Sequence, residues 1–461
     1  MNKKLLPLAV LTAVATGGLS TAQAVYVNNN GTGQVLIYPY YSVEGENDTY
    51  INIVNTTDQT KAVKVRFLEG MNSQEVLDFN LYLSPRDHWS AMVTESASGG
   101  ARLVTADESC TVPTIVGRPG STVDFRDLQY EGDSVDGIER TREGYVEIIE
   151  MAEVDGDHAD WLTHDSSGVP ANCGALVDSW SSGGTWNSNA DADILPAGGG
   201  LYGYGVLINP ADGVSAAYDA TAFGNFWPAG DWDHSGPGSL FPSLASGQAQ
   251  AQVIDGNALY DVTFDDSIDA LSATIMQSMI MNDFVLAPEI NAGTDWLVNF
   301  PTKRFYVNEE PAAAPFTTSW NPATSEACEP IEINYWDREE QSEFVRDVDF
   351  SPSPDADPIA LCKEVNVVTF NSADVLYASD RLGHNIDVAF DNGWMQMDFT
   401  QEAGRFVEGF DDDWDYRFHG LPAIGFGVQR YTNGDLGGLL ANYMGLVNHK
   451  ADRSIESGIF D

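Results

Sequence analysis

Residues 33–93 decide the fold class of this chain. They contain four short runs rich in β-branched and aromatic residues: Gly33-Gln-Val-Leu-Ile-Tyr-Pro-Tyr-Tyr41, Thr49-Tyr-Ile-Asn-Ile-Val-Asn55, Lys61-Ala-Val-Lys-Val-Arg-Phe-Leu68 and Val76-Leu-Asp-Phe-Asn-Leu-Tyr-Leu83. Gly, Asn, Asp and Thr residues, which favour turns, separate these runs. Runs of this length and composition between turn residues predict consecutive strands, which we expect to form an antiparallel β-meander.

The third run indicates which face of its strand is buried. Val63, Val65 and Phe67 alternate with Lys64 and Arg66. Because side chains point to opposite faces of a strand in turn, the valines and the phenylalanine should face the core. The two cationic side chains should then face water.

Similar runs continue through the chain. They predict strands at residues 88–93, 101–105, 144–151, 201–209, 214–218, 294–306, 331–336, 365–370, 394–399 and 422–431. Apolar residues at helical spacing predict one helix at about 266–281, behind Asp265 or Asp266 as its N-cap. Residues 106–140 and 152–200 lack periodicity and are expected to be long loop excursions. The prediction is an all-β protein with antiparallel β-sandwich-like units, long acidic loops and one packed helix.

The N-terminal residues have the pattern of an export signal. Met1-Asn-Lys-Lys is followed by an apolar run and by Ala22-Gln-Ala24, which predicts a secretory signal peptide over residues 1–24. No second long apolar run follows, so we expect no integral membrane segment after cleavage. The expected location is extracellular or at the cell surface by the general secretory route, with the periplasm as an alternative. We further expect an N-terminal unit over 25–308 and a C-terminal β-rich segment over 309–461, packed on the first.

The chain is strongly acidic. It carries 69 Asp and Glu against 22 Lys and Arg, a formal charge of −47; residues 1–24 hold two Lys and no acid, so their removal changes it to −49. A charge of this sign repels phosphate and anionic lipid, which argues against nucleic acid and membrane surfaces as partners. Two explanations remain open. The surface could be adapted to salty surroundings, where charges are screened over about 8 Å, or clustered carboxylates could bind Ca²⁺.

Four cysteines are expected to form two disulfides, because an exported chain meets an oxidising compartment. Three pairings are possible. We favour Cys110–Cys173 and Cys328–Cys362, since each pair is nearest in sequence and brackets one loop-rich segment. A zinc site is the alternative, but no Cys-x-x-Cys spacing supports it.

The acidic loops suggest calcium as the one cofactor. Asp155, Asp157 and Asp160 are spaced so that one loop could wrap a Ca²⁺ ion, although the full EF-hand pattern is missing. The neighbouring His158 and His164 could form a transition-metal site if the loop folds back.

Tryptophans in the Gly-, Ser- and Asp-rich segments suggest carbohydrate stacking. Trp227 and Trp232 are the candidates, because an exposed indole can pack on the apolar face of a sugar ring. The competing interpretation is that such side chains fill the ends of a sandwich.

Several segments resemble a group of exported bacterial proteins described only as cell surface proteins. The resemblance rests on Gly31-Thr-Gly-Gln-Val-Leu-Ile-Tyr-Pro-Tyr-Tyr41, Lys64-Val-Arg-Phe-Leu-Glu-Gly70, Asp295-Trp-Leu-Val-Asn-Phe-Pro-Thr-Lys303 and Gly420-Leu-Pro-Ala-Ile-Gly-Phe426. It implies a surface or extracellular setting. It carries over no catalytic or binding residue.

We expect a non-catalytic secreted structural or adhesive protein of the bacterial cell surface or extracellular matrix. Its partner would be a second copy of itself or surface polysaccharide. No nucleophile elbow, phosphate-binding loop or dinucleotide fingerprint is present, so no catalytic residue is assigned. A calcium-assisted carbohydrate-binding protein is the alternative, and an extracellular hydrolase is the third hypothesis.

Overall fold

The computed structural model describes residues 24–115, 121–130, 132–344, 359–435 and 437–460. The predicted signal peptide lies outside the described residues except for Ala24. Strands dominate, and of the described ladders only β24 (Val365–Phe370) with β25 (Gly383–Ile386) is parallel. The all-β, mainly antiparallel prediction is confirmed.

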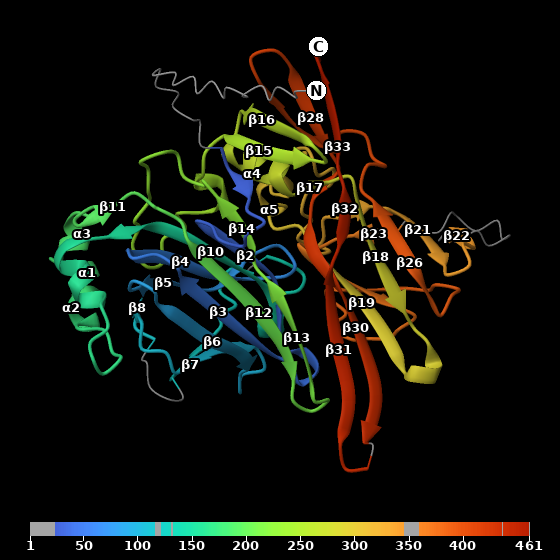
Figure 1. Cartoon of the computed structure of the whole chain (residues 1–461), viewed down its shortest axis with the longest axis horizontal. Helices are drawn as coiled ribbons and strands as arrows, with labels where there is room; N and C mark the ends of the chain where they lie inside the picture. The colour runs from blue at the N-terminus through green and yellow to red at the C-terminus, as the bar shows by residue number, and fades with distance from the viewer. Residues whose placement is uncertain (1–23, 116–120, 131, 345–358, 436, 461) are drawn as a thin grey trace, which may run out of the picture.

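The first half of the chain forms a sandwich of two sheets (Figure 1). The first sheet has the order β1-β14-β2-β10-β4-β5-β8, with β11 paired to β10, and the second has the order β13-β12-β3-β6-β7-β9. The strands of the first sheet are β1 (Tyr26–Val27), β2 (Val35–Ser42), β4 (Thr60–Glu69), β5 (Glu75–Leu83), β8 (Cys110–Val112), β10 (Glu143–Val154), β11 (Ile194–Leu195) and β14 (Thr221–Gly224). Those of the second are β3 (Asp48–Asn55), β6 (His88–Glu95), β7 (Ala101–Thr105), β9 (Ser121–Asp124), β12 (Leu201–Asn209) and β13 (Val214–Asp219).

The meander prediction for residues 33–93 is wrong, although each predicted strand is present. β2, β4 and β5 belong to the first sheet, whereas β3 and β6 belong to the second. β10 lies between β2 and β4 and pairs with both. Every residue of β2 is buried, so this strand needs neighbours along both edges and cover on both faces. β10 and β14 supply the edges from distant parts of the chain, where a meander would have placed β3.

The expectation that Lys64 and Arg66 face water is also wrong. Both side chains are buried beneath the segment 235–242, which crosses the outer face of the first sheet. Lys64 pairs with Asp78 at 3.3 Å, and the Arg66 guanidinium donates to the carbonyl of Pro242 at 2.6 Å. Alternation correctly divided the two faces of β4, but it could not show that a distant loop covers the second face.

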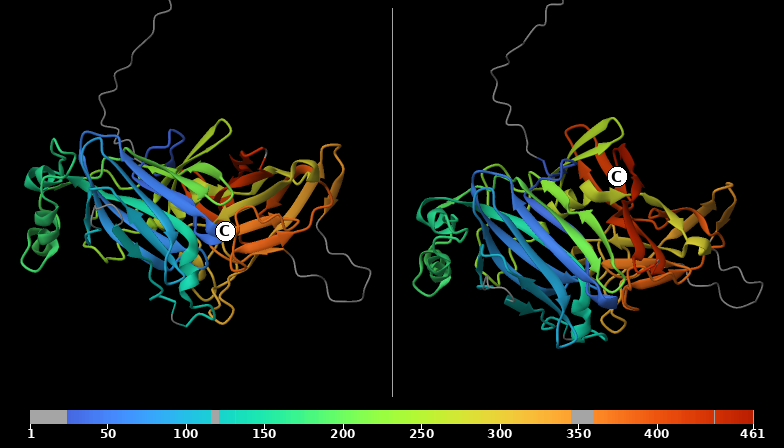
Figure 2. Two further views of the ribbon diagram at one scale, coloured as in Figure 1. Left: turned by 90° about the horizontal axis from the view of Figure 1, so that it is seen from below. Right: turned by 60° about the horizontal axis from the view of Figure 1, so that its bottom comes forward.

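The second half contains another sandwich. Its sheets have the orders β22-β21-β26-β18-β32 and β25-β24-β19-β30-β31. The strands not yet given are β18 (Met279–Val285), β19 (Ala292–Asn299), β21 (Glu332–Asp337), β22 (Ser342–Phe344), β26 (Asn392–Asp398), β30 (Ile424–Asp435), β31 (Leu440–Asn448) and β32 (Lys450–Asp452). The two halves lie side by side in all three views (Figures 1 and 2).

β19 joins the two halves because its side chains alternate between two cores. Leu297 packs in the core shared with the first half, whereas Trp296 and Val298 pack in the core of the second. β19 pairs with β24 and β30, so it is a central strand of the second half. Its predicted place in the first unit is therefore wrong, and sheet pairing continues across the expected boundary at residue 309. The predicted strand also ends early, at Asn299, and α5 (Arg304–Val307) follows.

A third layer combines the predicted helix with a five-stranded sheet. The sheet has the order β15-β16-β27-β28-β33: β15 (Gln250–Asp255), β16 (Ala258–Phe264), β27 (Phe406–Phe410), β28 (Asp415–His419) and β33 (Ser454–Gly458). α4 (Ser267–Ile275) begins behind Asp266 as predicted but ends six residues early. Met276 starts β17 (Met276–Gln277), which pairs with β29 (Leu421–Pro422), and the last residues of the expected helix enter β18. Strand partners thus override the helical spacing of Met279 and Ile280.

The two expected loop excursions contain regular structure. Residues 106–140 include β8 and β9, and residues 152–200 include α1 (Gly156–Leu162), α2 (Cys173–Trp180) and α3 (Thr185–Ser188). These three helices, here called the helical insert, pack on the first sheet through a small core that includes Leu162, Leu176 and Trp186. The remaining short elements are η1 (Glu44–Glu46), η2 (Ile138–Arg142), η3 (Leu244–Ser246), η4 (Pro288–Ile290), β20 (Glu329–Pro330) and β23 (Ala360–Leu361).

Both favoured disulfides are confirmed. Cys110–Cys173 ties α2 of the helical insert to β8, and Cys328–Cys362 lies beside the β20–β23 pair. Each bridge fixes a segment that has few other covalent or sheet constraints.

Candidate functional site

Two adjoining cavities lie where the two halves meet; together they are called the junction groove. One has a volume of about 300 Å³ and is lined by residues of β1, β14, β30 and β32 with their flanking loops. The other has a volume of about 250 Å³ and lies between β12, β13 and β31. Asp219 and Asn448 line both. Their volumes are at the small end of those of ligand pockets.

The groove has both polar and apolar lining residues. Its described lining includes the amides of Asn28, Gln277 and Asn448 and the carboxylate of Asp219, but no Ser, Cys or Lys. Such a set can hold a small polar ligand by hydrogen bonds. In the described residues none of its hydroxyl groups is hydrogen-bonded to Asp219 or His449, the pairing that activates a nucleophile for acyl transfer.

His449 and Asp219 are the candidate bases of the groove, and the ring of His449 is already used. Nε2 lies 2.9 Å from the carbonyl oxygen of Leu297, and Nδ1 lies 3.3 Å from the amide nitrogen of Asn282. Burial lowers the pKa of His449 to about 4, so the ring is neutral near pH 7. A neutral ring that donates through Nε2 and accepts at Nδ1 has no nitrogen left for catalysis.

Buried charged side chains at the contact between the halves and within the second half are paired inside the fold. Arg304, just after β19, reaches Glu147 on β10 at 2.9 Å, and Arg405 reaches Glu329 at 2.9 Å. Lys303 donates to the carbonyl of Ala327 at 2.6 Å. Burial lowers the pKa of Lys303 to about 8, and burial raises that of the nearby Glu364 to about 8. These groups lie outside the groove lining, and we assign them a structural role.

A relay that resembles a catalytic triad lies inside the helical insert. Asp193 is 2.7 Å from Nδ1 of His158, and Ser179 Oγ is 3.3 Å from Nε2. Ser179 and His158 are both buried, however, and Ser179 also donates to the carbonyl of Ala175 within α2. A serine nucleophile must reach a substrate carbonyl, so this arrangement serves the packing of the insert.

The three aspartates predicted to bind calcium lie at the start of the helical insert. Asp155 is the N-cap residue of α1, and Asp157 and Asp160 lie within that helix with exposed side chains. The structure does not gather their oxygens with other ligands in the described residues. A calcium site here stays a prediction.

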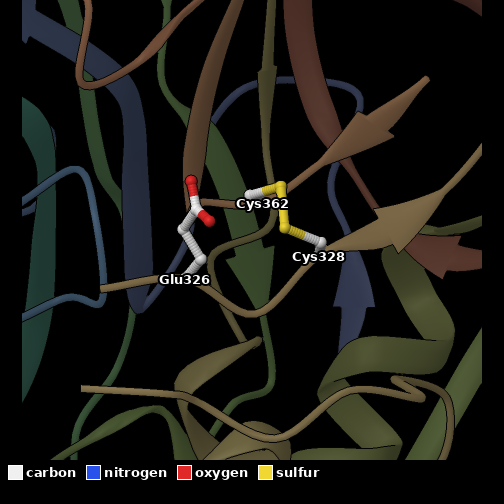
Figure 3. A group of neighbouring side chains, drawn as sticks. All are labelled: Glu326, Cys328 and Cys362. Atoms are coloured by element: carbon white, nitrogen blue, oxygen red, sulfur yellow. A yellow bond between two sulfur atoms is a disulfide. The ribbon is translucent and has the colours of Figure 1, made fainter. Parts of the chain in front are cut away.

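The two neighbouring histidines face different partners. His158 contacts Asp193, whereas His164 contacts Ser84 at 2.7 Å. The transition-metal site that would need both rings together is therefore not formed. Within the described ranges, only Glu326, Cys328 and Cys362 bring three ligand-type atoms together. Figure 3 shows the two sulfur atoms bonded to each other, so this cluster contains a disulfide in place of two thiolates.

The structure separates the two predicted sugar-stacking tryptophans. Trp227 is 4% exposed and donates from Nε1 to the carbonyl of Glu150 at 2.7 Å. It is a core residue in this structure, so it lacks the open ring face that stacking on a sugar needs. Trp232 is half-buried against the insert, with Nε1 3.1 Å from Asp191. Its role in sugar stacking stays a prediction.

The groove residues were missed by sequence reasoning because they are separated by hundreds of positions. Asn28 and Asp219 come from the first half, whereas Asn448 and His449 come from the last strands. No local motif joins them. The only signal in the sequence is that Asn448-His449 interrupts a run of strand-forming residues.

Comparisons with known protein families, with curated proteins and with solved structures gave no match. In the described part of the chain, no helix combines the length and the apolar character that crossing a membrane requires.

Proposed function

We propose that this protein is a non-catalytic, exported structural or adhesive component of the bacterial cell surface or extracellular matrix. The observation that carries the proposal is the chemistry of the junction groove, which has hydrogen-bonding groups but, in the described residues, no hydroxyl or thiol hydrogen-bonded to a base. The buried charges nearby are paired within the fold, as the Arg304–Glu147 contact illustrates. Two disulfides fit a protein that works in an oxidising compartment.

Cell fractionation tests the proposal. The protein should stay with washed cells or sedimenting matrix and should be released by chelator or by high salt. A lysozyme-type or other soluble exported protein expressed in the same cells is the control for nonspecific retention in the cell pellet. Recovery of most of the protein free in the culture medium, with no fraction bound to cells, would contradict the proposal.

A carbohydrate-binding role is the second candidate. It is favoured by exposed aromatic residues on a sheet of the second half, where Trp394, which is 40% exposed, stacks on Trp336. A contiguous patch of large exposed apolar side chains often marks a binding site. Calcium would assist this role only if the exposed carboxylates of α1 bind the ion.

A further inference from the structure

A pair of tryptophans lies on the outer face of the sheet β22-β21-β26-β18-β32. Trp336 on β21 and Trp394 on β26 occupy directly opposed positions, and their rings stack with centroids 4.3 Å apart and planes 15° from parallel. Trp394 is 40% exposed and Trp336 is partly exposed. The two side chains therefore lie outside the core of the second half.

The register shows why both indoles point outward. On β21, Ile333 and Tyr335 pack in the core of the second half, and on β26 Met395 and Met397 do so. Residues that alternate with these must face away from that core. The outward set, called the tryptophan face, includes Glu332, Asn334, Trp336, Trp394, Gln396, Asp398, Met279, Met281 and Asp283.

Polar groups surround the indole pair. Gln396 lies two residues from Trp394 on the same strand, and Asn334 lies two residues from Trp336 and directly opposite Gln396. Asn334 is only 9% exposed, and its Oδ1 has no hydrogen-bond partner in the described residues. A buried amide oxygen without a partner costs free energy unless a donor reaches it. Asn334 Oδ1 is closed to solvent and Nδ2 already donates to Glu332 at 3.1 Å, so the half-buried Gln396 is the amide of this face that a ligand can reach.

We propose that the tryptophan face binds a neutral polysaccharide. The electron-rich faces of the stacked indoles attract the C–H groups of a pyranose ring, while Gln396 bonds to its hydroxyls. The charge of the face selects a neutral ligand: Asp283 lies directly opposite Trp394, Glu332 and Asp398 lie farther along the two strands, and the chain as a whole carries −47. Anionic polysaccharide is repelled by such a surface. This inference rests on the proposed adhesive function, for which it names the ligand.

A purely structural explanation of the pair makes a different prediction. Opposed aromatic residues on neighbouring strands stabilise a sheet by roughly 0.2–1 kcal/mol. If that were their whole role, Trp394→Ala would lower the melting temperature and leave glycan binding unchanged. Binding and stability are therefore measured separately on each variant.

Affinity gel electrophoresis of the full exported chain tests the proposal. The probes are laminarin, dextran and galactomannan as neutral polysaccharides and alginate as the anionic one. At least one neutral polysaccharide should retard the protein, and alginate should not. Trp336→Ala and Trp394→Ala should each weaken the apparent affinity about tenfold or more, as buried aromatic anchors do in other interfaces. Trp394→Phe, which keeps a ring, should lose less.

Trp414→Ala is the matched control. Trp414 is also an exposed tryptophan, but it lies in the turn between β27 and β28, away from the tryptophan face. This variant should bind as the original chain does. The proposal is overturned if no neutral polysaccharide retards the protein, if alginate retards it equally, if Trp414→Ala weakens binding as much as Trp394→Ala, or if Trp394→Ala binds normally.

Failure of this inference can be distinguished from failure of the proposed function. A protein that stays with cells but is retarded by none of the neutral glycans is adhesive by another surface, and only the inference fails. A protein found free in the medium that nevertheless binds glycan through Trp394 overturns the adhesive function and leaves the binding site standing.

Discussion

Several charged residues of this protein are buried, and Glu69 shows how such a charge is stabilised. Its carboxylate accepts hydrogen bonds from the backbone N–H groups of Met71 and Asn72 and lies 2.9 Å from Arg140. The Arg140 guanidinium also reaches Asp133 at 2.8 Å and lies 4.0 Å from the centre of the Tyr130 ring. Both side chains of the Glu69–Arg140 pair are fully buried. Removing either charge would leave the other buried without a partner, which lowers the free energy of unfolding substantially.

Replacing Arg140 by methionine tests this pair. Arg140→Met leaves Glu69 and Asp133 without their cation, and it should lower the free energy of unfolding by about 3–5 kcal/mol. Urea denaturation measures the change. Arg86→Met is the control, because the Arg86–Asp58 pair is exposed and should contribute nothing measurable. Equal losses in the two variants would show that burial does not set the strength of these pairs.

Asp295 makes stability depend on pH. Its side chain is buried on β19, and Oδ2 accepts a hydrogen bond from the backbone N–H of Leu376 at 2.8 Å. Burial raises the pKa of Asp295 from its ordinary 3.8 to about 7. Between these two values the folded protein holds a proton that the unfolded chain has released. The free energy of unfolding therefore falls as the pH rises through this window, by about 1.4 kcal/mol per pH unit.

Asp295→Asn should abolish the part of the pH dependence of stability that Asp295 causes. The amide keeps an oxygen for the Leu376 N–H but does not titrate, so the variant should gain stability relative to the original chain as the pH rises from about 4 to about 7. Chemical denaturation at several pH values gives the difference between the two proteins. Other buried acids, such as Glu364, titrate in both and cancel. A difference that is independent of pH would contradict the assignment.

At the scale of elements, the helical insert depends on one covalent link. Cys110–Cys173 joins α2 to β8 across a separation of 63 residues, and the small core around Trp186 lies beside it. Trp186 stacks on His158 with ring centroids 4.2 Å apart. These contacts are local to the insert and the outer face of the first sheet. The insert can therefore open without disturbing the core between the two sheets.

Removing this disulfide should loosen the insert first. Loop closure entropy predicts a loss of about 4 kcal/mol for Cys110→Ala with Cys173→Ala. Limited proteolysis should then cut within residues 156–193 while the remaining sheets stay protected. The double variant at Cys328 and Cys362 is the control and should not expose the insert. Cleavage spread evenly over the whole chain would show that the insert and the sandwich unfold together.

At the scale of the whole molecule, charge acts against the folded state. Acidic residues outnumber basic ones by 69 to 22. Most of the bases that could offset this excess inside the fold are already paired, as Lys61 is with Glu150 at 2.8 Å. The excess acid therefore lies at the surface, where it repels itself and responds to salt.

Salt should stabilise the protein. Raising NaCl from about 0.05 M to about 1 M should raise the melting temperature by several degrees, because screening weakens repulsion between surface carboxylates. CaCl₂ at matched ionic strength separates screening from binding. If α1 holds calcium, a further rise should appear that EDTA reverses and that Asp157→Asn with Asp160→Asn removes. A melting temperature that falls or stays constant in NaCl would contradict surface repulsion.

The sequence by itself determined the class of the protein, fourteen of its 33 described strands and both disulfides. β7, β12 and β24 coincide with their predicted ranges, because each is a short run of strand-forming residues between turn residues. The start of α4 behind Asp266, one of the two expected N-cap residues, was also predicted, although the Asp266 side chain makes no capping hydrogen bond. These features depend on neighbours in the chain, so local patterns are sufficient to predict them.

Only the tertiary structure decided which strands pair and which residues meet. In the tertiary structure β10 lies beside β2, and a distant loop buries Lys64 and Arg66. α4 ends before Met276, which pairs with Pro422 in a strand. The junction groove and the opposed pair Trp336–Trp394 arise in the same way. Alternation along each strand could show that a tryptophan faces outward from its own strand. It could not show that two strands separated by more than fifty residues lie side by side, because pairing is chosen by the burial of the whole sheet.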